Sequence, residues 1–197
     1  MGCDVRIADP SKGARILEAA AQLFAERHYH EVRMEDIAAR AGVAKGTLYL
    51  HFRCKDDLYA GLIQDGLARL GDRIEERLGD APSPDWKVRV VVRESIRFFG
   101  QFGYLVELGR RVEAQGAGSG IEALQQNRER FMGLMAGILR EFPGADRLSD
   151  DDLRLGATAL AGMLREVLSL HPRPWPDDLD ERLTRLFVDG FRRTLPA

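Results

Sequence analysis

The sequence is poor in cysteine and contains no long hydrophobic run. Its 197 residues include only two cysteines, Cys3 and Cys54, which lie far apart and lack Cys or His partners at metal-binding spacing. This pattern predicts neither a disulfide framework nor a zinc site. No stretch reaches the ~18 apolar residues that span a bilayer, and residues 1–13 lack the apolar core of a signal peptide. We therefore expect a cytoplasmic protein with no membrane partner.

An excess of one charge is also missing. The formal net charge is −2, from 29 Lys and Arg against 31 Asp and Glu. Residues 1–55 are the only part that leans basic, with nine Lys and Arg, seven Asp and Glu, and three of the four histidines; the rest of the chain holds the other 20 basic and 24 acidic residues. Because this contrast is weak, charge alone permits nucleic-acid binding without arguing for it.

Runs of alternating Val, Ile and Thr bounded by turn residues, the usual pattern of a β-sheet, are absent as well. Apolar residues instead recur at helical spacing almost throughout, which predicts an all-α protein of about nine helices without internal repeats. The expected helices cover approximately residues 10–27, 34–41, 45–51, 56–78, 84–102, 105–112, 121–141, 149–170 and 177–194.

Motifs for catalysis are missing too. The sequence shows no Ser/His/Asp or Cys/His set, no paired-carboxylate motif, no glycine-rich phosphate loop and no metal-ligand spacing. We therefore predict that the protein is not an enzyme and needs neither a cofactor nor a metal ion.

The strongest functional signal is a pair of short helices joined at a glycine. Residues 36–52 read DIAARAGVAKGTLYLHF and place Ala38, Gly42 and Leu48 at the spacing of a DNA-binding helix-turn-helix. Ala38 leaves room where two helices cross steeply, and Gly42 permits the left-handed backbone of a tight turn. This spacing alone also occurs by chance, so the surrounding residues must support it. The apolar residues expected to fill the core beside the first helix are Ile37, Val43 and Leu48.

The outer face of the second of these helices carries short or hydrogen-bonding groups. Lys45 can neutralise a phosphate, and Thr47 and Tyr49 can donate to phosphate oxygens. Small residues at Ala44 and Gly46 let the helix approach the major groove closely. His51 completes this face, whereas Phe52 lies on the Leu48 side and is expected in the core.

Residues 11–60 resemble the DNA-binding domain of the TetR family of bacterial transcriptional regulators. The chain reads LFAERHY, then MEDIAARAGVAKGTLYLHF, then CKDDLY, in the order typical of that family. The resemblance covers about a quarter of the chain. The residues for which it implies a DNA contact are Lys45, Thr47, Tyr49, His51 and, at the start of the next helix, Lys55.

Three positions depart from the family pattern. His28 stands where a turn glycine is usual, Ala44 where Ser or Thr is frequent, and Arg33 where Ser or Thr often caps the helix. Loss of that cap is expected to cost about 1 kcal/mol, and we expect Arg33 to contact a phosphate instead. Cys54 occupies an N-cap-like position before the helix at 56–78. A redox role for Cys54 is not favoured, because no second cysteine is near in sequence.

The resemblance also implies two domains, a DNA-binding domain at residues 10–55 and an effector-binding and dimerisation domain at 56–197. In this family the central helices usually surround a pocket for a small molecule. Methionines and aromatic side chains suit an apolar ligand, but ordinary core packing explains them equally well. The candidate effector-binding residues are Phe98, Phe102, Tyr104, Met132, Met135 and Met163.

A homodimer is expected, since one helix-turn-helix covers one half of an operator. By resemblance, the last two helices pair across a two-fold axis. Their apolar stripes include Leu155, Leu160, Leu164, Leu183, Phe187 and Phe191. We predict a repressor that a small-molecule effector releases from its double-stranded DNA operator.

Three alternatives stay open at this point. In the first, the C-terminal part binds a protein partner rather than a metabolite. In the second, the chain is a small-molecule carrier whose helix-turn-helix is vestigial. The sequence also does not give the sign of control, so an activator is a third alternative. Neither the effector nor the operator sequence can be read from these residues.

Overall fold

The computed structural model describes residues 10–79, 81–102, 119–170 and 174–195. Within these ranges every regular element is helical, which confirms the predicted all-α class. The elements are α1 (Pro10–Glu26), η1 (Tyr29–Glu31), α2 (Met34–Ala41), α3 (Lys45–His51), α4 (Lys55–Leu78), α5 (Pro84–Gln101), α7 (Ser119–Arg140), η2 (Ala145–Arg147), α8 (Asp150–Leu170) and α9 (Leu179–Arg192). The helix expected at 105–112 lies outside the described residues.

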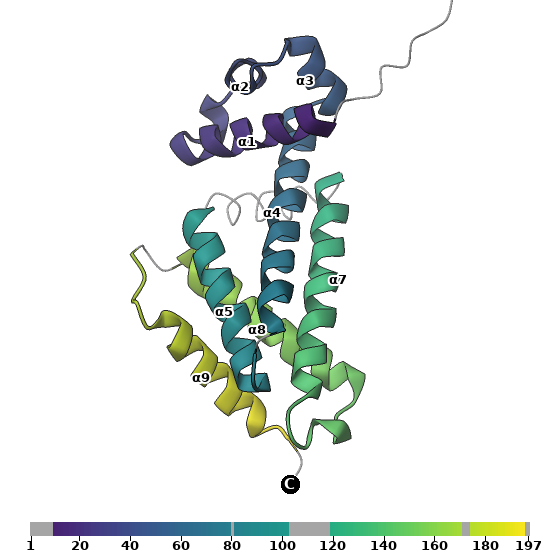
Figure 1. Cartoon of the computed structure of the whole chain (residues 1–197), viewed down its shortest axis with the longest axis vertical. Helices are drawn as coiled ribbons and strands as arrows, with labels where there is room; N and C mark the ends of the chain where they lie inside the picture. Colours follow the sequence, from purple (N-terminus) through teal and green to yellow (C-terminus); the bar gives the residue numbers. More distant parts are fainter. Residues whose placement is uncertain (1–9, 80, 103–118, 171–173, 196–197) are drawn as a thin grey trace, which may run out of the picture.

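The molecule is elongated, with α1, α2 and α3 at one end and α5, α7, α8 and α9 at the other (Figure 1). The long helix α4 joins the two ends. It contacts α1 near its start and packs against α7 and α5 along the rest of its length. Helix α9 packs on α5, and α8 packs on α7. Any movement of α4 relative to its neighbours therefore moves the three-helix end.

The apolar core of the molecule extends into the three-helix end. On α1, Ile16, Leu23 and Phe24 are all buried. Ile37 of α2 and Leu48 of α3 are completely buried against it, and Val43 is half-buried beside them. These contacts fix α2 and α3 on α1, leaving their other faces to solvent.

Helix starts follow the capping signals of the sequence. The Ser83 hydroxyl accepts a hydrogen bond from the backbone N–H of Trp86 at 3.3 Å, and Pro84 occupies the first turn of α5. Ser149 and Asp152 form a reciprocal cap before α8, with bonds of 3.2 and 3.1 Å to each other's backbone N–H. Such local pairs explain why the helix starts could be read from the sequence.

The apolar stripes of α8 and α9 mainly serve the protomer's own core, which corrects their assignment to the dimer interface. The members of the stripe that are buried inside the protomer are Leu160, Leu164, Leu183, Phe187 and Phe191. Leu155 alone of the predicted set is outward, with 70% of its surface exposed. Leu186 of α9, which was not in the set, is 66% exposed.

The described part of the chain shows neither a membrane-spanning helix nor a metal-binding cluster. None of its helices is both long enough and apolar enough to cross a membrane. In the same residues, no three His, Cys, Asp or Glu side chains are grouped so that they could hold a metal ion.

Candidate nucleic-acid interface

The turn between α2 and α3 has the geometry that the glycine predicts. Gly42 adopts φ 63° and ψ 37°, the left-handed conformation that side chains disfavour. Its N–H donates to the Ala39 carbonyl at 3.2 Å, and the N–H of Val43 donates to the Ala38 carbonyl at 3.0 Å. This pair of bonds is the Schellman motif, which ends a helix and redirects the chain. The turn therefore fixes the angle at which α3 leaves α2.

An arginine of α1 holds the same turn from outside. Nη2 of Arg15 donates to the carbonyl of Ala41 at 2.6 Å and lies 3.4 Å from the carbonyl of Gly42. These carbonyls belong to the end of α2, where backbone acceptors lack partners and the helix dipole favours a cation. Sequence reasoning missed Arg15, because no local pattern links it to a turn 26 residues away.

The residues predicted for the outer face of α3, except His51, lie on that face. Ala44 precedes the helix in an extended conformation, and its side chain is exposed together with Lys45 and Gly46. Tyr49 is 38% exposed, and Thr47 is half-buried. Phe52 packs against the core as expected. These positions present one cation, two hydroxyl groups and, at Ala44 and Gly46, little or no side chain in front of the backbone. Such a surface suits contact with a DNA backbone.

Leu50 is an exposed apolar residue of α3 that the sequence reasoning did not select. Its exposed fraction is 61%, the largest among the big hydrophobic residues of the three-helix end. An outward leucine next to hydrogen-bonding groups matches the apolar contact that proteins make with the thymine methyl group. The sequence could have indicated this exposure, because Leu50 stands between Tyr49 and His51, on the side of α3 away from Leu48.

Lys45 carries an acidic partner that the sequence reasoning also missed. Its Nζ lies 2.6 Å from Oε1 of Glu35 at the start of α2, and both side chains are more than half exposed. The hydrogen bond from Lys45 lowers the pKa of Glu35, and the same bond raises the pKa of Lys45. The ammonium group also lies 5.9 Å from the ring of Tyr49. Lys45 is thus charged and held near the start of α3.

The structure shows the surroundings of Arg33 and His28, two of the residues that depart from the family pattern. The side chain of Arg33 makes no capping bond, as its type predicts; instead Asp36 accepts a bond of 3.1 Å from the backbone N–H of Arg33. Arg33 is exposed, so a phosphate contact from it stays a prediction. His28 has φ −66°, and a glycine is not needed there.

The remaining predicted contacts lie where α3 and α4 meet α1. His51 is half-buried, with its Nδ1 3.3 Å from the position that a Cβ on Gly13 would take. Lys55 begins α4, and its Nζ lies 6.0 Å from the ring of Phe24. Cys54 does cap α4, since its sulfur accepts a bond of 3.5 Å from the N–H of Asp57. A DNA contact from His51 or Lys55 stays a prediction.

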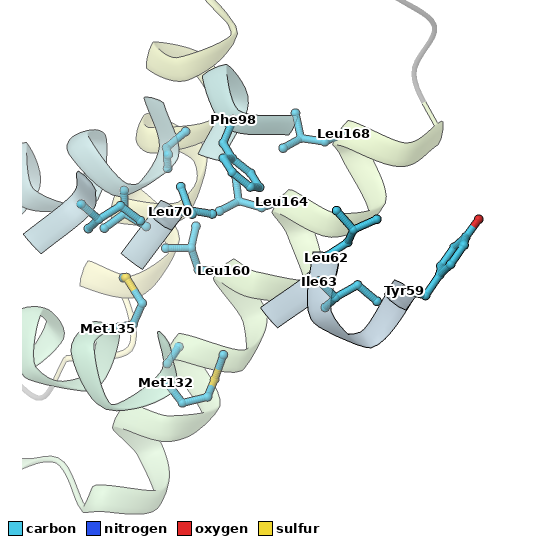
Figure 2. Close-up of a cluster of buried hydrophobic side chains, with 14 of the residues drawn as sticks. Tyr59, Leu62, Ile63, Leu70, Phe98, Met132, Met135, Leu160, Leu164 and Leu168 are labelled. Carbon is cyan, nitrogen blue, oxygen red and sulfur yellow. The ribbon is translucent and has the colours of Figure 1, made fainter. Parts of the chain in front are cut away.

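The candidate effector residues gather at the other end of the molecule. Phe98, Met132 and Met135 are buried in the main apolar cluster, and Phe102 and Met163 are half-buried against it. Figure 2 shows Phe98 of α5 beside leucines of α4 and α8, with Met132 and Met135 in the same cluster. Tyr104 lies outside the described residues. Five of the six candidates therefore belong to the hydrophobic core or pack against it.

Comparisons with known proteins agree with this geometry. Residues 16–62 match the family model described as bacterial regulatory proteins, tetR family. Over 162 residues the chain is 26% identical to a fatty acid metabolism regulator protein of Bacillus subtilis (strain 168), covering 80% of this chain and 82% of the relative. It spans only 42% and 51% of the length of the two curated relatives that follow.

Solved structures share the fold over most of both chains. The transcriptional regulator FadR from Bacillus subtilis, in complex with stearoyl-CoA, superposes with a TM-score of 0.75 at 22% identity, covering 90% of this chain and 98% of that one. AibR, in complex with isovaleryl coenzyme A and operator DNA, gives a TM-score of 0.64 at 21% identity, covering 91% and 97%.

A helix-turn-helix at one end of a long helix and a helical bundle at the other together define a DNA-binding transcriptional regulator. The family match falls on the helix-turn-helix and the helix that leaves it. Residues 16–62 are thus a DNA-binding domain of the TetR family of bacterial regulatory proteins.

Proposed function

We propose that this regulator is a homodimeric repressor of genes of fatty-acid or acyl-CoA metabolism, released from its operator by an acyl-CoA. The observation that carries the proposal is the likeness to a fatty acid metabolism regulator over 80% of the chain, which includes the bundle as well as the helix-turn-helix. In this proposal α3 enters the major groove, and residues 56–197 bind the effector and the second protomer.

The apolar cluster supports an acyl chain as the ligand. Phe98, Met132 and Met135 are buried at the junction of α5, α7 and the neighbouring helices. Methionine side chains repack at low cost, so such a cluster can open for a flexible hydrocarbon. FadR and AibR, the two solved regulators named above, were crystallised with ligands that carry an acyl chain. A ligand in the cluster would displace α4 relative to α7 and change the spacing of two α3 helices.

Outward leucines support the dimer. Leu155 and Leu186 are largely exposed on α8 and α9, and a Cβ added to Gly162 or Gly190 would meet nothing within 4 Å. Apolar and small residues on neighbouring outer faces favour close packing against a second copy. Leu186→Glu is expected to give a monomer by light scattering, whereas Leu50→Glu, an equally exposed leucine at the other end, should stay a dimer.

A protein partner in place of a metabolite has less support. The solved structures of this fold named above carry acyl-CoA ligands. The curated relatives are transcriptional regulators, so the proposal assigns the chain no catalytic step.

The test is a footprint on the DNA upstream of the protein's own gene and its neighbours. It is repeated with stearoyl-CoA, isovaleryl-CoA, free coenzyme A and stearate. We expect a protected palindrome whose half-sites lie about 34 Å apart or a multiple of that, and loss of protection with one of the two acyl-CoA molecules. Protection that none of the four ligands changes would overturn the acyl-CoA effector but leave the DNA-binding function intact.

A further inference from the structure

One buried carboxylate between α4 and α5 is surrounded by three arginines. Glu94 is 1% exposed. Its Oε2 lies 3.1 Å from Nη2 of Arg73, and its Oε1 lies 3.1 Å from Nη1 of Arg97 and 3.4 Å from Nε of Arg77. A buried carboxylate at this point draws the three guanidinium groups to one place and fixes their positions.

The cluster has more positive than negative charge. Three arginines surround one carboxylate, and two other carboxylates of the same part of α4 are paired elsewhere. Asp72 and Glu75 both pair with Arg130 of α7, at 2.9 Å each. Among the residues that the structure describes, Glu94 is the only carboxylate paired with these arginines, so three positive charges meet one negative charge there.

The arginines also keep hydrogen-bond donors for a ligand. Each guanidinium has five N–H groups, and the side chains of Arg73, Arg77 and Arg97 are 40%, 53% and 53% exposed. Glu94 takes only one close contact from each of them. Each guanidinium is planar, with its donors in a fixed fork of the kind that recognises phosphate oxygens.

The inner side of the same two helices is apolar. Leu70 and Ile74 alternate with the two arginines along α4, and Phe98 follows Arg97 on α5; all three are buried in the main apolar cluster. Figure 2 shows Leu70 and Phe98 pointing into this cluster. A molecule with an anionic group and a hydrocarbon tail would therefore find both kinds of partner across one helix pair.

We propose that Arg73, Arg77 and Arg97 form an anion site for the phosphate groups of a coenzyme A thioester, with Glu94 as the residue that holds them together. This inference rests on the proposed function, because it places the nucleotide part of the proposed effector. Two of the three arginines belong to α4, so phosphate binding acts directly on the helix that carries the DNA-binding end.

The test measures ligand affinity by titration calorimetry on the full chain. The ligands are isovaleryl-CoA, stearoyl-CoA below its micelle concentration, stearate and 3′,5′-ADP. The variants are Arg77→Gln and Arg97→Gln, each of which leaves two arginines on Glu94, and the double variant. The matched control is Arg69→Gln on α4, whose arginine pairs with Asp65 at 2.9 Å and is 63% exposed. Thermal unfolding of each variant confirms that it is folded.

Each single variant should raise the Kd for both thioesters roughly 5-fold and the double variant about 20-fold. Stearate binding should not change, and Arg69→Gln should match the wild type. Thioester affinities that are equal in folded wild type and double variant overturn the anion site and leave the acyl-CoA effector standing. If no thioester binds but 3′,5′-ADP does so through these arginines, the anion site stands and the acyl-CoA effector fails. If neither binds, both fail.

Discussion

Nζ of Lys45 lies 2.6 Å from Oε1 of Glu35, so an ion pair joins the first turns of the two helices of the helix-turn-helix. A DNA phosphate that reaches Lys45 must share it with Glu35 or replace that carboxylate. The pair is exposed, and an exposed pair contributes little to stability. The pair matters because it sets the charge that α3 presents to DNA. Lys45→Ala lowers this positive charge, and Glu35→Gln raises it.

Lys45→Ala is predicted to weaken DNA binding at every sequence. A lost phosphate contact lowers the salt dependence of binding by about 0.9 per contact, so by about 1.8 for a dimer. Fluorescence anisotropy with operator and unrelated DNA, over a series of salt concentrations, measures both effects. The control is Lys87→Ala, which breaks a 2.6 Å pair with Glu141 far from α3. An unchanged salt slope for Lys45→Ala would remove Lys45 from the interface.

Glu35→Gln is predicted to act in the opposite direction and to strengthen DNA binding a few-fold. The hydrogen bond from Lys45 lowers the pKa of Glu35 below its ordinary value of 4.5. Glu35 is therefore ionised throughout the neutral range, and the gain should be constant from pH 6 to pH 8. The same anisotropy titrations check this. Weaker binding by Glu35→Gln would mean that Glu35 orients Lys45 rather than competing with DNA for it.

Gly42→Ala is predicted to destabilise the DNA-binding end. The residue has φ 63°, which costs a side chain about 1–2 kcal/mol. An added Cβ would also lie 3.0 Å from Nη2 of Arg15, the donor that holds this turn. Urea unfolding monitored by circular dichroism should show the loss, and operator affinity should fall with it. Wild-type stability in this variant would show that the turn relaxes without cost.

Gly46→Ala is the matched substitution, with the opposite effect on stability. A Cβ at Gly46 meets nothing within 4 Å, and alanine is a better helix former, so stability should rise by about 0.5 kcal/mol. If α3 approaches the major groove through Gly46, the same methyl group should weaken operator binding. A variant that is more stable and binds DNA normally would place Gly46 away from the groove.

The helices of the DNA-binding end were predictable because their signals are local. Gly42 ends one helix by its own backbone preference, and the spacing of Ile37 and Leu48 shows which faces are buried. The observed bounds of α2 and α3 agree with the prediction residue for residue.

Contacts between distant segments could not be predicted in this way. The bond from Arg15 to Ala41 and the pairing of Glu94 with Arg73 depend on how separate helices pack. The stripe on α8 and α9 shows the same limit, because periodicity identifies an apolar face but not the surface that covers it. Leu160 and Phe187 are covered by the protomer itself, whereas Leu155 is left outward.

Asp180 of α9 forms a similar long-range contact with α5. This contact leads to a prediction for the pH dependence of stability. Its Oδ2 lies 2.9 Å from Nε of Arg93 and 3.3 Å from Nε of Arg89, and its side chain is 14% exposed. Burial raises the pKa of Asp180, but the hydrogen bonds from Arg93 and Arg89 outweigh burial and bring it below the ordinary value of 3.8. The stabilisation is therefore fully present above pH 3.8 and is lost as the pH falls through the still lower pKa of the folded state.

Asp180→Asn should lower the free energy of unfolding at pH 7 by about 1–2 kcal/mol, because two half-buried arginines lose the negative charge of their hydrogen-bond acceptor. Asp178→Asn is the control, since its pair with Arg182 is exposed on one helix and should be worth about 0.5 kcal/mol or less. Urea unfolding measured from pH 7 down to pH 3 checks both variants. The difference between wild type and Asp180→Asn should shrink below pH 3.8, because only the wild type loses a charge there. A difference of the same size at pH 7 and pH 3 would show that Asp180 acts by shape rather than by charge.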